Sequence, residues 1–215
     1  MPQEKNIPKF IMRNDEGEIC PYFIADSHTA KRLSGLSQIM HDLSQAKELM
    51  TLIDRVGNDE IKYSLWMSSV VTYAKCFISA NNGRGIKLEE KHINKFNPES
   101  LNYHKGLIEL RHSYFAHAGN SESIRARIGI ILSPIHKDKE VLGANYFMLK
   151  QQIITDENIK LFCCLCDGVY KVVEEMSNKT HKKLIEEYRK MDVGLLYEKA
   201  NDKTAFDKLF SAVNF

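Results

Sequence analysis

The chain has 215 residues, enough to bury a hydrophobic core in one large domain or two small ones. Hydrophobic residues make up 43% and charged residues 27% of the chain, a balance that excludes an intrinsically disordered protein. Because 30 basic side chains nearly balance 28 acidic ones, the net charge of +2 provides no general attraction to nucleic acid, and RNA binding would need a local basic patch.

The sequence also indicates where the protein works. No apolar run approaches the ~18 residues that span a bilayer, and the first residues lack the apolar stretch of a secretory signal. The five cysteines are an odd number without the spacing of a disulfide framework, which favours free thiols in a reducing compartment. We therefore expect a cytoplasmic protein with no membrane partner.

The first half of the chain is expected to be helical after a short N-terminal part. Residues 1–25 are predicted to form an arm or a small hairpin, because residues 14–17 are a turn signal between two apolar runs. A helical bundle is predicted for residues 26–191. Its first helix begins near Asp26 or Ser27 and repeats apolar residues every three or four positions. The second begins near Asp59 and ends at residues 81–83, and its broad apolar surface predicts a deeply buried helix.

In the second half of the chain, the spacing of the apolar residues changes twice, from helical to alternating and back to helical. A third helix, with Pro98 in its first turn, runs to about Gly119. Apolar residues then alternate as in a strand, which predicts a β-hairpin at about residues 123–154. A long helix follows from Asp156, with a break near Ser177, and short helices are expected at residues 192–215. The predicted fold class is mainly α, a helical bundle with a small β-hairpin insert after the third helix.

One stretch at the end of the third helix, residues 110–118, combines an arginine and histidines with an apolar face. Arg111 borders that face, so its charge must be paired or must line a cavity. His117 follows six residues later, which places it about 120° away around a regular helix. The two side chains can converge only if the helix ends or distorts before Gly119, or if a second copy of the motif completes the site.

Such a pair can carry out a definite reaction. An arginine fork binds phosphate oxygens, and a histidine titrating near neutral pH can move a proton from or to a hydroxyl. Together they suit the attack of an RNA 2′-hydroxyl on its own phosphodiester, which needs no metal or other cofactor. His112 and Tyr114, which lie between them, are candidates for positioning the phosphate or sharing the proton.

These residues resemble the signature of the HEPN domains, which are helical bundles. The signature is an arginine, a polar residue, three to five further residues and a histidine, here Arg111, His112 and His117 with the Phe-Ala-His ending of the abortive-infection and phage-defence type. The Tyr-Ala-Lys-Cys-Phe run at residues 73–77, the Asn-Gly-Arg-Gly run at 82–85 and the later β-insert are also similar to that subgroup. In layout the resemblance covers residues 26–180, whereas its specific motif covers about a dozen residues.

The resemblance implies a metal-independent endoribonuclease with no cofactor, usually a homodimer whose two motifs face each other in a cleft. It implies the setting of a toxin or anti-phage effector, with an antitoxin or another defence-system protein as a further partner. A second hypothesis is a non-catalytic HEPN-like module that binds RNA or protein. A third is a helical interaction protein unrelated to HEPN, in which Arg111 and His117 point to different solvent faces.

Other residues were weighed for a role in binding. Arg84 and Lys87 form a basic connection before the third helix, which is either a solvent-exposed loop or an RNA contact beside the motif. Cys163, Cys164 and Cys166 have a CCxC spacing inside an apolar helix, which favours buried, inert thiols over a metal site. His104 lies on the motif helix and is expected to be a surface histidine.

Overall fold

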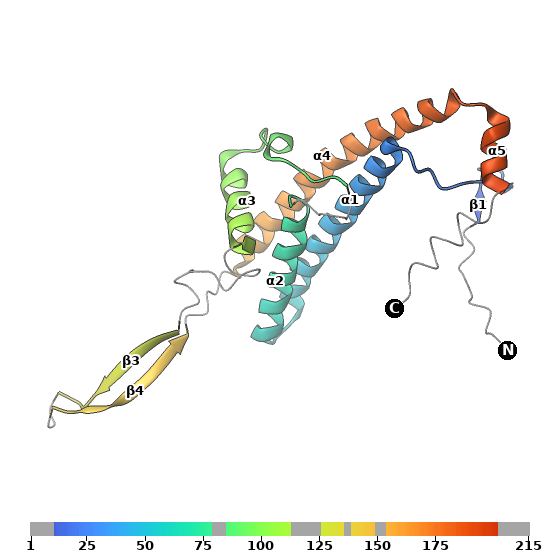
Figure 1. Ribbon diagram of the computed structural model, residues 1–215. Helices are drawn as coiled ribbons and strands as arrows, with labels where there is room; N and C mark the ends of the chain where they lie inside the picture. Colours follow the sequence, from blue (N-terminus) through green and yellow to red (C-terminus); the bar gives the residue numbers. More distant parts are fainter. Residues whose placement is uncertain (1–10, 79–84, 113–125, 136–138, 149–153, 202–215) are drawn as a thin grey trace, which may run out of the picture. The chain divides into compact units, whose positions relative to one another are not determined.

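The computed structural model describes residues 11–78, 85–112, 126–135, 139–148 and 154–201 (Figure 1). The described elements in chain order are β1 (Met12–Arg13), β2 (Ile19–Cys20), α1 (His28–Leu52), η1 (Ile53–Arg55), α2 (Asp59–Lys75), η2 (Glu90–His92), α3 (Pro98–Leu110), β3 (Ala126–Leu132), β4 (Val141–Met148), α4 (Asp156–Arg189) and α5 (Val193–Asn201). This order confirms a mainly helical protein with a β-hairpin between the third and fourth long helices. Within these ranges, every helix is too short or too polar to cross a bilayer.

α1, α2 and α3 each begin at a capping side chain, close to where the sequence predicted their starts. The Ser27 hydroxyl accepts a hydrogen bond from the Ala30 amide at 3.2 Å before the first full turn of α1. The Asn58 side chain caps α2 by accepting from two backbone amides. At α3, Asn97 caps the helix, and proline occupies the first turn, where no amide hydrogen bond is lost. These starts are therefore determined by local side-chain chemistry.

The end of α2 and the continuity of α4 differ from the prediction. α2 ends at Lys75, earlier than expected, because the Cys76 carbonyl accepts a hydrogen bond from the Leu88 amide instead of continuing the helix. The break expected near Ser177 is absent, and α4 is one continuous helix. Serine and asparagine lower helix propensity only slightly, and neither removes a backbone amide as proline does. The hydroxyl of Thr180 instead donates to the Met176 carbonyl at 2.8 Å within the helix.

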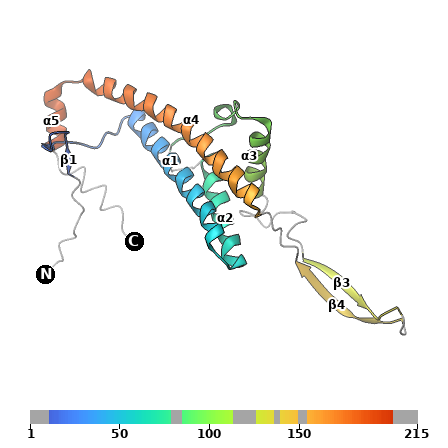
Figure 2. The ribbon, with the colours of Figure 1, turned by 180° about the vertical axis from the view of Figure 1, so that it is seen from behind.

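The contacts of the chain divide it into two compact units, residues 35–175 and residues 1–34 with 176–215. Within the first unit, α1 lies beside both α2 and α4 (Figure 2). Ion pairs link α1 to α2 and α1 to α4, and the Tyr103 hydroxyl on α3 donates to the Asn158 carbonyl on α4 at 3.1 Å. The largest fully buried side chains of this core are Leu36, Ile39, Leu43, Met50, Ile53, Val70, Tyr73, Leu88, Ile93, Phe162, Val169 and Val173. Trp66 is also buried.

The second unit holds the small hairpin expected at the N-terminus. β1 and β2 pair antiparallel across a turn that contains Gly17, whose positive φ of 81° favours glycine. The ring of Phe23 packs edge-on against Tyr188, with 5.6 Å between centroids. The Thr29 hydroxyl donates to the Glu187 carboxylate at 2.8 Å. Among the described residues of this unit, single side-chain contacts such as these link the N-terminal segment to α4.

The insert expected at about residues 123–154 is an antiparallel hairpin of β3 and β4. Its register pairs Ile128 with Tyr146 and Ile130 with Ala144. One extra residue, Leu142, forms a bulge opposite the step between Ile131 and Leu132. The change from helical to alternating apolar period therefore correctly predicted both strands.

Candidate functional site

The arginine of the motif directly follows the last residue of α3. The regular helix ends at Leu110, and the next two residues, Arg111 and His112, have π-helical geometry. Such a local widening of a helix is common at functional sites. The helix thus departs from regular α geometry at the motif, which is one of the two conditions under which Arg111 could meet His117.

Arg111 continues the face of α3 that packs into the core. His104 and Leu107 are the buried residues of α3, and Arg111 follows Leu107 by four positions. Seven residues are almost two full helical turns, so Arg111 lies on the same side of the helix as His104. Arg111 is half-buried, whereas His112 is exposed. The prediction that this arginine borders the apolar face is therefore confirmed.

The described contact of Arg111 is with its neighbour. The Arg111 Nη1 donates to the His112 Nδ1 at 3.3 Å. An imidazole nitrogen that accepts a hydrogen bond carries no proton, so neutral His112 then carries its proton on Nε2. Nε2 is the nitrogen that His112 can offer as a donor to a phosphate oxygen. This contact brings together two of the predicted site residues.

Of the remaining predicted site residues, only Lys87 lies within the described part of the chain. His117, Tyr114 and Arg84 lie outside the described residues. Lys87 is exposed, and the buried side chain of the next residue, Leu88, anchors the segment to which it belongs. Its exposure agrees with both readings of the basic connection, the solvent-exposed loop and the RNA contact.

His104 is not the surface histidine that was expected. Only 3% of the residue is exposed, and its Nδ1 lies 2.8 Å from the hydroxyl of the fully buried Tyr73. The Phe77 ring packs against the imidazole, with 4.5 Å between centroids. Burial lowers the pKa of His104 and raises the pKa of Tyr73 well above its ordinary value. The imidazole is therefore neutral, and its Nδ1 shares one hydrogen bond with the tyrosine hydroxyl, whose direction is set by the tautomer of His104.

A sequence signal for this pair did exist. His104 lies three residues before Leu107 and seven before Arg111, within the apolar stripe of α3. A histidine on such a stripe requires a buried partner, and Tyr73 lies on the apolar stripe of α2. The identity of the partner could not be read from spacing, because the two residues are 31 positions apart.

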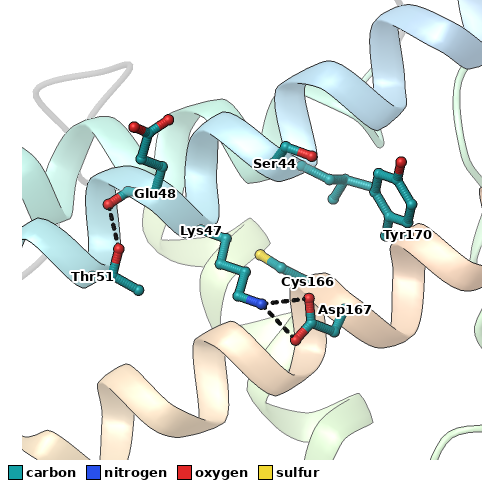
Figure 3. Close-up of a pocket in the computed structure, with 8 residues that line it drawn as sticks. Ser44, Lys47, Glu48, Thr51, Cys166, Asp167 and Tyr170 are labelled. Atoms are coloured by element: carbon teal, nitrogen blue, oxygen red, sulfur yellow. Dashed lines mark hydrogen bonds and ion pairs between the residues drawn. The ribbon is translucent and has the colours of Figure 1, made fainter.

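An open groove lies between α1 and α4, with a volume of about 380 Å³ (Figure 3). Its centre is the ion pair of Lys47 with Asp167, whose two oxygens each lie 2.8 Å from the lysine nitrogen. This hydrogen bond raises the pKa of Lys47. The other lining residues are Leu43, Ser44, Glu48, Thr51, Cys166 and Tyr170. The ion pair offsets the charges of Lys47 and Asp167, so the Glu48 carboxylate leaves the lining with a net negative charge.

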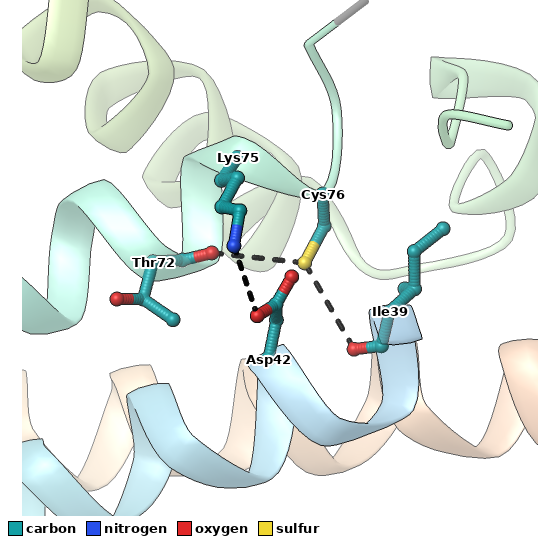
Figure 4. Close-up of polar contacts among 5 residues, drawn as sticks. All are labelled: Ile39, Asp42, Thr72, Lys75 and Cys76. Carbon is teal, nitrogen blue, oxygen red and sulfur yellow. Dashed lines mark hydrogen bonds and ion pairs between the residues drawn. The ribbon is translucent and has the colours of Figure 1, made fainter. Parts of the chain in front are cut away.

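A second polar cluster joins α1 to α2. The carboxylate of Asp42, whose side chain is 8% exposed, lies 3.3 Å from the Lys75 ammonium (Figure 4). Cys76 directs its sulfur at the Ile39 carbonyl beside this pair. The cluster therefore satisfies a buried carboxylate at a helix contact. Sequence reasoning did not single it out, because Asp42 and Lys75 come from different helices.

The three clustered cysteines have different environments. Cys166 is buried, Cys163 is half-buried and Cys164 is exposed. The expectation of buried, inert thiols is thus right for Cys166 and wrong for Cys164, which lies on the outer side of α4. Burial raises the pKa of both Cys163 and Cys166, so these thiols stay protonated at neutral pH. In the described part of the chain no three histidine, cysteine or acidic residues are grouped as metal ligands.

The chain was compared with protein-family models, with curated proteins and with solved structures, and none of the three comparisons gave a match.

Proposed function

We propose that the chain is a metal-independent endoribonuclease of the HEPN type, with Arg111 and His117 as its catalytic residues. The observation that carries this proposal is the position of Arg111, half-buried on the core-facing stripe of α3 where the regular helix ends. The aliphatic stem of an arginine gains by packing at such a position, whereas its guanidinium needs a partner if its charge is partly buried, and a phosphate can be that partner.

The proposed reaction cleaves RNA by internal transfer. His117 accepts the proton of a ribose 2′-hydroxyl, and the 2′-oxygen forms a bond to the neighbouring phosphorus. The bond from phosphorus to the 5′-oxygen breaks, and that oxygen takes a proton from a histidine. The products are a 2′,3′-cyclic phosphate and a 5′-hydroxyl end. The Arg111 fork stabilises the charge that develops on the phosphate oxygens.

The other predicted residues assist this centre. His112, which accepts a hydrogen bond from Arg111 at 3.3 Å, orients the guanidinium and offers its Nε2 proton to phosphate. Tyr114 contributes a hydroxyl beside the scissile group. Arg84 and Lys87 supply the local positive field that the net charge of +2 does not provide.

The biological setting that we propose follows from the resemblance to the HEPN domains. Two copies of the chain contribute two motifs to one RNA-binding cleft. An RNase of this kind acts as a toxin or anti-phage effector, and an antitoxin or another defence-system protein restrains it until it is needed.

RNA cleavage by purified variants in the presence of a metal chelator tests the proposal. We expect wild type to cut RNA and to leave 5′-hydroxyl ends, which a polynucleotide kinase labels without prior phosphatase treatment. Arg111→Ala and His117→Ala should each lose about 100-fold or more in rate, as when a transition-state donor is removed. Arg111→Lys keeps the charge but not the bidentate fork, so it should retain only part of the activity.

Lys105→Ala is the matched control, because Lys105 is an exposed cation on the same helix. Its activity should equal that of wild type. The enzyme proposal is overturned if folded wild-type protein leaves RNA intact, or if Arg111→Ala cuts as fast as Lys105→Ala. RNA that is bound but uncut by wild type, with binding lost in Arg111→Ala, would instead show the non-catalytic binding module.

A further inference from the structure

One face of the β3–β4 hairpin consists entirely of apolar side chains that face solvent. The alternation of the strands places Ile128, Ile130, Leu132, Val141, Ala144 and Tyr146 on this face. Its five large side chains are each 60–67% exposed. The opposite face holds Gly129, Ile131, Gly143 and Asn145, and its isoleucine is less exposed, at 44%. We call the first set the apolar hairpin face.

A two-stranded hairpin with such a face is not expected to be stable by itself. Isolated two-stranded hairpins are marginally stable in water, and they need a further layer against their apolar side. Soluble monomers also rarely expose a contiguous apolar patch of this kind without a function. We therefore expect another molecular surface to cover the apolar hairpin face.

The charge of this surface favours a second copy of the chain over nucleic acid. No charged residue occurs at positions 128–132 or 141–146. A phosphate backbone would find no cation on this face to replace its counterions. A second copy of the same face would meet neither repulsion nor a charge that must be desolvated.

The area and relief of the face agree with a symmetric pair. Five large side chains exposed to this extent present roughly 600 Å² per copy, hence about 1,200 Å² for two copies, the lower bound of a specific interface. At the centre, Ile130 pairs with the small Ala144. A twofold axis beside this pair would place the isoleucine of each copy opposite the alanine of the other.

We infer that the apolar hairpin face is a homodimer interface, in which the β3–β4 hairpins of two chains pack face to face. This inference rests on the hairpin alone and does not depend on the proposed ribonuclease activity. Dimerisation through this face would also give each particle two copies of the Arg111 motif.

The test compares two isoleucines that are adjacent in sequence and lie on opposite faces of the hairpin. We expect sedimentation equilibrium to show that wild type is a dimer. Ile130→Lys places a charge at the centre of the interface, and its dissociation constant should rise at least ~30-fold, as for a central hot-spot residue. Ile131→Lys carries the same charge on the opposite face and should dimerise like wild type. Circular dichroism confirms that both variants keep their helices.

A mixing experiment identifies the contact itself. Ile130→Lys and Ile130→Glu should each be monomeric alone and should form a heterodimer together, because the two charges meet near the twofold axis. Arg111→Ala should remain a dimer, so a chain that dimerises without cutting RNA would remove the proposed function and leave this inference standing.

Three outcomes would overturn the inference. One is a wild type that stays monomeric throughout a dilution series. Another is a dimer that Ile130→Lys and Ile131→Lys weaken equally. The third is a monomer that co-sediments with phosphatidylcholine and phosphatidylserine vesicles through Ile130, which would make a lipid surface the occupant.

Discussion

Aliphatic side chains have opposite environments in the helical core and in the β3–β4 hairpin. Between the helices, Ile39, Val70 and Val173 are fully buried. In the hairpin, Ile128 and Leu132 are about two-thirds exposed. Burial of apolar area is the main stabilising term in folding, so the helices acquire their stability within one chain. The hairpin gains no such stabilisation until a second surface covers its apolar face. This difference suggests that the helical core stabilises the fold and that the hairpin mediates association.

Truncation of one large side chain in each region should give the largest contrast. Phe162→Ala removes a fully buried ring of α4 and should lower the free energy of unfolding by ~3–5 kcal/mol. Ile128→Ala should change it by less than ~0.5 kcal/mol, as at other exposed positions. Urea denaturation followed by circular dichroism measures both, in an Ile130→Lys background so that dimerisation does not contribute. Equal losses would mean that the hairpin packs within its own chain, and the contrast would be wrong.

The buried Tyr73–His104 pair should give the next largest effect, because it is a polar contact inside the apolar core. Tyr73→Phe removes the hydroxyl that lies 2.8 Å from the imidazole and leaves a buried ring nitrogen without its hydrogen-bond partner. We expect a loss of about 1–3 kcal/mol in the free energy of unfolding. The exposed Tyr197→Phe is the control and should have no measurable effect.

A double-mutant cycle separates this hydrogen bond from the loss of packing. His104→Phe combined with Tyr73→Phe replaces both partners by apolar rings, so the double variant should be less destabilised than the sum of the two single ones. Strict additivity would show that the 2.8 Å contact contributes no coupling energy.

How far the sequence alone predicts this molecule depends on whether a feature is local. Helix starts at Ser27, Asn58 and Asn97 depend on neighbouring residues, and all three caps are present. The hairpin was predictable because the apolar period changes from between three and four residues to two. The continuity of α4 through Ser177 was not predictable, because the propensity differences there are small and tertiary packing decides.

The candidate site shows the same limit. The register of Arg111 at the border of the apolar face follows from helical spacing alone, and the structure agrees. The burial of His104 could not be predicted from its neighbours, because its hydrogen-bond partner lies 31 residues away in the sequence. The exposure of the apolar hairpin face could not be predicted either, because it depends on which surface covers that face. Alternating apolar residues predict which side of a strand will be buried, but they do not predict that a second chain is needed to bury it.

Two helical glycines, one with open space beside it and one packed against a ring, allow the same comparison at single residues. A Cβ at Gly106 on α3 would meet nothing within 4 Å, whereas a Cβ at Gly168 on α4 would lie 3.2 Å from the Phe96 ring. Gly106→Ala should therefore raise the free energy of unfolding by ~1 kcal/mol, the gain in helix propensity. Gly168→Ala has the same gain but must displace the ring, so it should be the less stable of the two variants in urea denaturation. The opposite ranking would show that α4 is loosely packed at Gly168.

The smallest effect at neutral pH, and the one that grows on acidification, belongs to His104. Its pKa is lowered in the folded protein by burial, from an ordinary value of 6.5. Above that value the imidazole is neutral in both states, and the stabilisation is fully present. As the pH falls below it, the unfolded chain binds a proton that the folded chain refuses, so stability is lost until the lowered pKa of the folded state is reached.

His104→Gln should abolish this loss, because the amide can donate to or accept from the Tyr73 hydroxyl and does not titrate. The matched control is His181→Gln, since His181 is an exposed histidine on α4. Measured by urea denaturation between about pH 7 and pH 5, the slope of the free energy of unfolding should fall by up to one proton in His104→Gln and stay unchanged in His181→Gln. Equal slopes in all three proteins would mean that acid reaches His104 in the folded state, and hence that the core around α3 opens to water more readily than its buried residues indicate.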